Sequence, residues 1–178
     1  MSKKISVTIG AVISEVNQGA MDWARDHAGE RLGTKWYDGE SSTEPSEKWP
    51  VSESVRLAIR EIIAKAFSRE TPMNRLVEMI QDVSGFSDER AQIVADTEIK
   101  FAHSCSNLDA WKKSGVVKSV RWITSSLHDV MDECDSNRDA SPIPLGEDFP
   151  SGVPSPPAHI GCCCSIVIAE LNEQRANY

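Results

Sequence analysis

The chain has 178 residues, and 27 aspartates and glutamates outnumber 19 lysines and arginines, for a formal net charge of −8. A hydrophobic content of 40% and a charged content of 26% are typical of a globular domain and exclude a disordered chain. The acidic balance argues against general coating of nucleic acid. The apolar runs are too short for a membrane span or a secretion signal, so we expect no membrane partner and a reducing cytoplasm.

Four helices are expected in the first two thirds of the chain, because apolar residues recur there at three- and four-residue steps. The expected helical ranges are 8–33, 52–68, 71–83 and 87–113. Ser52 and Ser87 have the side chains of N-cap residues, and Thr71 followed by Pro72 is typical of a cap and first turn. Residues 34–51 lack a period and contain glycine and prolines, which predicts a mobile loop.

The pattern changes after Gly115. Residues 116–123 are β-branched and aromatic, and residues 164–169 are similar, so we expect two strands that pair antiparallel. The connection between them, residues 125–163, should be mainly loop, and a loop with so few apolar residues normally needs a cross-link. We therefore expect an α+β protein in which N-terminal helices precede a small antiparallel β unit. Its expected parts are an N-terminal helix and loop (1–51), a helical part (52–114) and the β unit (115–178).

Candidate metal ligands lie at both ends of the long loop. Cys134, His159, Cys162 and Cys164 offer the thiolates and imidazole that form tetrahedral structural zinc sites. Zinc would then supply folding energy that the side chains of the loop cannot. Two alternatives remain open at this point: the cysteines could be buried as small hydrophobic residues, or they could serve redox or disulfide chemistry. Further candidate ligands are His128, Asp132 and Cys163.

Several short motifs occur in a characteristic order. They are Arg90–Glu98 (RAQIVADTE), Trp111–Val117 (WKKSGVV), Arg121–Thr124 (RWIT) and Pro156–His159 (PPAH), followed by Cys162 and Cys164. The set resembles the phage Mu F-like head morphogenesis family, the minor capsid proteins of tailed phages and prophages, over residues 20–169. The resemblance implies a non-enzymatic virion component near the portal that assists head assembly and DNA packaging or ejection. Its partners would be other capsid proteins and packaged DNA, first in the host cytoplasm and then in the virion.

The chain departs from the family pattern at three positions. Asp96 stands where arginine is usual, Met131 replaces the first cysteine of a Cys-x-x-Cys pair, and Cys163 replaces an arginine between the last two cysteines. A related form has a histidine upstream of an Asp-x-Cys-Asp core, which His128 and Asp132 match. The resemblance therefore implies that His128 could bind the metal or orient one of its ligands, and it leaves open which two of the three consecutive thiols coordinate.

Lysines and arginines gather around the end of the last expected helix. Lys112, Lys113, Lys118 and Arg121 could contact DNA or an acidic portal surface, or they could form a solvated face. The alternative function is a small metal-dependent enzyme or nuclease-like effector, but no nucleophile–base pair is visible in the sequence. Glu98, in the middle of a helix, is expected to hold a buried hydrogen bond rather than to act as an acid or base.

Overall fold

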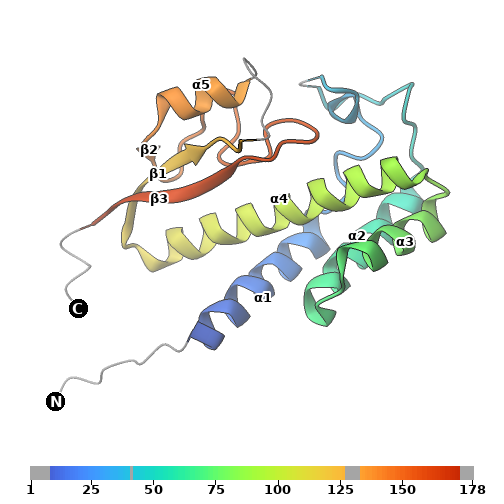
Figure 1. Ribbon diagram of the computed structural model, residues 1–178, viewed down its shortest axis with the longest axis horizontal. Helices are drawn as coiled ribbons and strands as arrows, with labels where there is room; N and C mark the ends of the chain where they lie inside the picture. The colour runs from blue at the N-terminus through green and yellow to red at the C-terminus, as the bar shows by residue number, and fades with distance from the viewer. Residues whose placement is uncertain (1–8, 41, 127–132, 173–178) are drawn as a thin grey trace.

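The computed structural model describes residues 9–40, 42–126 and 133–172, and the side chains from residue 17 onward within them. Helices fill the first two thirds and a small antiparallel sheet the last third, which confirms the α+β class (Figure 1). The helices are α1 (Ile9–His27), the 3₁₀ helix η1 (Lys35–Asp38), α2 (Glu53–Arg69), α3 (Met73–Ser84), α4 (Asp88–Ser114) and α5 (Glu133–Ala140). The strands are β1 (Val117–Ile123), β2 (Ile143–Pro144) and β3 (Ser165–Leu171).

Helix α1 ends at His27, so the expectation that it runs to residue 33 is wrong. Gly29 has a φ of +79°, a left-handed conformation that interrupts the helix and that glycine adopts without strain. Its N–H donates to Glu98 Oε2 at 2.9 Å instead of continuing the helical ladder. A contact with α4 thus ends α1, and the apolar pattern of α1 alone could not reveal it.

The other long helices begin and end close to the expected residues. The hydroxyls of Ser52 and Ser87 accept hydrogen bonds from the backbone N–H groups three residues on, as N-caps do. The expectation that Thr71 caps α3 is wrong, since Pro72 is the N-cap and Leu76 N–H donates to its carbonyl. Helix α3 therefore begins one residue later than the Thr-Pro pair suggests.

The sheet has the order β2-β1-β3, with both pairings antiparallel. The pairing predicted between the two longer strands is confirmed by the register Trp122↔Ile166. The expectation that residues 125–163 are mainly loop missed β2 and α5. Helix α5 has no apolar stripe, because its buried residues are only Cys134 and Asn137.

Two hydrophobic cores divide the molecule, and α4 contributes to both. Helices α1, α2 and α3 lie on one side of α4, while the sheet and α5 lie on the other (Figure 1). Phe101 belongs to the helical core and Leu108, two turns later, to the core of the β unit. The loop 34–51 is anchored on the helical core by Trp36, which is 8% exposed, and by half-buried Trp49. Among the described residues, no helix is long and apolar enough to cross a membrane.

Candidate metal centre

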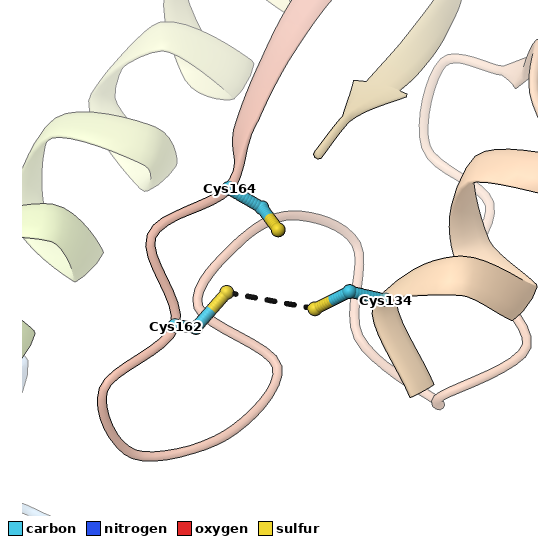
Figure 2. Close-up of side chains that lie close together, drawn as sticks. All are labelled: Cys134, Cys162 and Cys164. Carbon is cyan, nitrogen blue, oxygen red and sulfur yellow. Dashed lines mark hydrogen bonds between the residues drawn. The ribbon is translucent and has the colours of Figure 1, made fainter. Parts of the chain in front are cut away.

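Three cysteine thiols converge at the junction of α5 and the loop that leads into β3. Cys134 lies in the first turn of α5, and Cys162 and Cys164 lie immediately before β3 (Figure 2). The three sulfur atoms are within 4.8 Å of one another. The residues are 0%, 2% and 8% exposed, respectively, and none of the three forms a disulfide. This group could hold a metal ion.

A tight turn brings the two C-terminal cysteines to Cys134. Cys162 N–H donates to the carbonyl of His159 at 3.2 Å, and Gly161 has a φ of +72° in the turn between them. A side chain other than glycine would be strained there. Lys100 Nζ, from α4, donates to the Cys162 carbonyl at 2.8 Å and so fixes the turn to the helical part.

His159 meets the cluster through one ring nitrogen. Its Nε2 lies 3.3 Å from Cys134 Sγ, and its Nδ1 lies 2.8 Å from the Ile160 carbonyl. A carbonyl oxygen can only accept, so the second contact places the proton on Nδ1 and leaves the Nε2 lone pair directed at the thiols. Histidine ligands of metals are oriented in this way.

The pKa values of the three thiols depend on one another. Cys134 Sγ and Cys162 Sγ are 3.7 Å apart. The hydrogen bond from Cys134 lowers the pKa of Cys162 to about 3, and the same bond raises the pKa of Cys134. Burial raises the pKa of Cys164. The hydrogen bond between Cys134 and Cys162 therefore favours one thiolate in this pair, and thiolates bind metals.

Trp122 adds a polar hydrogen next to the thiols. Its residue is fully buried, and its Nε1 finds no partner that meets the usual hydrogen-bond geometry within the described residues. The indole N–H favours the charged form of Cys164, as a donor near a thiolate does. The Trp122 N–H, which has no conventional acceptor in the core, would thus stabilise Cys164 as a thiolate ligand.

Two donor distances match those around a tetrahedral ion. A Zn–S bond of about 2.3 Å places two sulfur ligands about 3.8 Å apart, and a Zn–N bond of about 2.0 Å places nitrogen and sulfur about 3.5 Å apart. The separations of 3.7 Å between Cys134 and Cys162 and of 3.3 Å between Cys134 and His159 are close to these values. His159 nevertheless lies outside the group whose ligand atoms are all within 4.8 Å of one another, so the structure brings together three thiols as metal ligands and places His159 beside Cys134.

The remaining predicted ligands are placed elsewhere or lie outside the description. Cys163 is half-buried and does not belong to the thiol group. His128 and Asp132 fall outside the described residues. Cys105, on α4, is also outside the group, and burial raises its pKa to about 11, so it is a neutral thiol.

The four basic candidates for a DNA or portal contact are all exposed. Lys118 forms an ion pair with Glu170 across β1 and β3 at 3.0 Å. Within the described part of the chain, Lys112, Lys113 and Arg121 form no ion pair. Three positive charges therefore remain available near the end of α4 and on β1.

Sequence reasoning missed two residues that support the site. Lys100 is 62 positions from the carbonyl that it holds, and nothing in the local pattern of α4 distinguishes it from a solvated lysine. Trp122 lies in the RWIT motif, where a tryptophan is most simply an apolar anchor. It fills that role against Phe149, with ring centroids 5.0 Å apart, and also presents its N–H to Cys164.

The chain was compared with known proteins in three ways. No protein-family model, no curated protein and no solved structure matches it.

Proposed function

We propose that the chain is a non-enzymatic structural component of a tailed-phage head, in which a zinc ion closes the loop between β1 and β3. The single observation that carries the zinc assignment is the buried group of Cys134, Cys162 and Cys164, whose sulfur atoms lie within 4.8 Å of one another and beside which His159 Nε2 lies 3.3 Å from Cys134 Sγ. Bound zinc would contribute folding energy and hold both ends of the loop, while the four residues orient it and exclude water.

The burial of the thiols favours a structural role over catalysis. A thiol and an imidazole 3.3 Å apart, as in Cys134 and His159, would also suit a cysteine nucleophile and its base. A nucleophile must reach its substrate, however, and Cys134 is fully buried. Cys162 and Cys164 are 2% and 8% exposed, so the centre resembles a closed site rather than an open one.

The assignment to a phage head rests on the ordered motifs of the sequence, and the positions of their residues are consistent with a structural part. Glu98 holds Gly29 and Tyr37, and Trp122 fills the core of the β unit. The exposed charges of Lys112, Lys113 and Arg121 supply a surface for an acidic protein or for DNA.

The test of the function is deletion of the gene from the phage or prophage. We expect purified wild-type virions to contain the chain by mass spectrometry, and the deletion to yield few infectious particles with incompletely packaged heads. Complementation with the wild-type gene should restore infectivity. Normal assembly and infectivity without the chain would refute the proposal.

The enzyme alternative has its own experiment. Purified protein, with and without added divalent metal, should leave DNA and RNA intact. Hydrolysis that is lost in Cys134→Ser but kept in Cys105→Ser would instead assign catalysis to the thiol group. The second variant is a suitable control because Cys105 is a half-buried thiol outside the group.

A further inference from the structure

A cavity of about 220 Å³ lies between the helical part and the loop of the β unit. Its lining comes from α1, the turn that follows it, α4 and residues 153–155. The walls are mainly apolar, with Trp23 stacked on Phe101 at 6.0 Å between centroids and Pro154 contributed by the loop. Ligand sites are often found between structural units, as enclosed apolar pockets with a few polar groups.

Arg31 supplies a cation at this cavity. Its guanidinium carbon lies 4.3 Å from the Phe101 ring centroid and 5.2 Å from that of Trp36, so two aromatic rings hold the side chain. In the described part of the chain it forms neither an ion pair nor a side-chain hydrogen bond. Burial raises the pKa of nearby Glu98, and the charge of Arg31 acts to lower it. Because the guanidinium makes no hydrogen bond there, its fork of N–H donors is available to a planar anion.

Ser155 provides a second polar group without a partner. The residue is 3% exposed and lines the cavity, yet its hydroxyl has no hydrogen-bond partner among the described residues. The hydroxyl is therefore available to donate a hydrogen bond to a ligand oxygen in the cavity.

The other polar groups of the cavity already have partners. Glu98 accepts from Gly29 N–H at 2.9 Å and from Tyr37 Oη–H at 2.8 Å, so each of its oxygens is used. His27 Nδ1 lies 3.1 Å from a carboxylate oxygen of Glu30. The Arg31 guanidinium and the Ser155 hydroxyl are therefore the groups that remain available to a ligand.

We propose that this cavity binds a small carboxylate with an aromatic or branched apolar body. The carboxylate would pair with the fork of Arg31 and accept from Ser155, and the body would lie against Trp23 and Phe101. The volume is sufficient, since a cavity of about 150 Å³ admits benzene. This inference is independent of the metal centre and of the proposed phage function.

The experiment is an NMR titration of the intact protein that follows the indole N–H signal of Trp23. The probes are phenylacetate, its neutral isostere phenylacetamide and the cation 2-phenylethylammonium. We expect saturable shifts with phenylacetate and at least about tenfold weaker binding of the other two, because the charge-assisted pair with Arg31 is lost. Arg31→Gln should weaken phenylacetate binding about tenfold or more, whereas Arg25→Gln, an exposed arginine on α1, should not change it.

A second variant separates binding from folding, because Arg31→Gln also removes the stacking on two rings. Ser155→Ala deletes the hydroxyl and adds no atom, and it should weaken phenylacetate binding severalfold while the near-ultraviolet circular dichroism is unchanged. The proposal is overturned if phenylacetate does not bind, if the amide or the ammonium binds as well, or if neither variant weakens binding. Tighter binding of the ammonium would identify the carboxylates as the recognition groups instead.

Discussion

Lys100 Nζ donates a 2.8 Å hydrogen bond to the main-chain carbonyl of Cys162, so the long helix α4 holds the turn that carries the candidate metal ligands. The bond joins residues 62 positions apart and crosses from the helical part to the β unit. Ile160, in the same turn, packs against the helical core. The conformation of the metal-binding turn and the position of the β unit on α4 are therefore coupled.

Loss of this bond should be measurable. Lys100→Met keeps the length of the side chain and removes the ammonium group, which leaves the Cys162 carbonyl without its donor. We expect a decrease of about 1–2 kcal/mol in the free energy of unfolding by urea, since hydrogen bonds to charged groups contribute about 1.5–3 kcal/mol. Lys113→Met, at an exposed position on the same helix, should leave stability nearly unchanged. Equal effects of both variants would show that the bond contributes nothing.

Metal removal should destabilise the protein. Elemental analysis should find about one zinc per chain, and a chelator should lower the melting temperature, because an ion bound only by the native state stabilises it by several kcal/mol. Cys134→Ser should abolish zinc binding, and Cys105→Ser should retain it, since only the former residue belongs to the thiol group. If the metal-free protein keeps its full stability, the cysteines act as small hydrophobic residues.

Glu98 should make stability depend on pH. Burial raises its pKa above the ordinary value of 4.5. A pKa that is higher in the folded than in the unfolded state adds stability that is complete below about pH 4.5 and is lost as the pH rises through the folded value. Glu98→Gln cannot ionise and can still accept from Gly29 N–H, so it should gain stability relative to the wild type between pH 4.5 and 8.

Urea unfolding of both proteins across that range provides the measurement. Glu47→Gln is the control, because Glu47 is exposed and its substitution should change stability little at any pH. Glu98→Ala should cost about 2 kcal/mol or more at every pH, since it leaves the Gly29 N–H and the Tyr37 hydroxyl without their acceptor. If the difference in unfolding free energy between the wild type and Glu98→Gln is the same at every pH, Glu98 does not change its charge in this range.

The contact between α1 and α4 depends on a small residue. A methyl group added at Gly19 would collide with the hydroxyl of Ser106, which belongs to α4. We expect Gly19→Ala to destabilise the protein by about 1–3 kcal/mol through overpacking. The double variant Gly19→Ala/Ser106→Ala should recover part of the loss, because the colliding oxygen is gone. If the double variant loses as much unfolding free energy as the two single variants together, the contact between Gly19 and Ser106 is contradicted.

Helix α4 was predictable because its signals are local. Ser87 and Gly115 mark its ends in the sequence, and both are caps in the structure. Helix α5 was not predictable from the sequence. It has eight residues and buries only Cys134 and Asn137, so its sequence shows no apolar periodicity. It is held instead by distant contacts, among them Asn137 Nδ2–H donating to Ser151 Oγ at 2.8 Å.

The cysteines of the candidate site were predictable from the sequence, but the residues that support them were not. Ligand chemistry and loop length were enough to group Cys134 with Cys162 and Cys164, which the structure places within 4.8 Å of one another. The sequence names Cys162 and Cys164 first and Cys163 as a further candidate, and the structure places Cys163 outside the thiol group. The contacts of Lys100 and Arg31 depend on tertiary packing, and no local pattern encodes them.

Helix α4 has 27 residues and is about 40 Å long, and it supplies side chains to both hydrophobic cores. Melting of either core would remove the packing that keeps the helix folded and so weaken the other. The helical part and the β unit should therefore unfold in a single cooperative transition, with equal calorimetric and van't Hoff enthalpies. A fragment cut within α4 would interrupt this mutual support, and neither half should retain a folded core by itself.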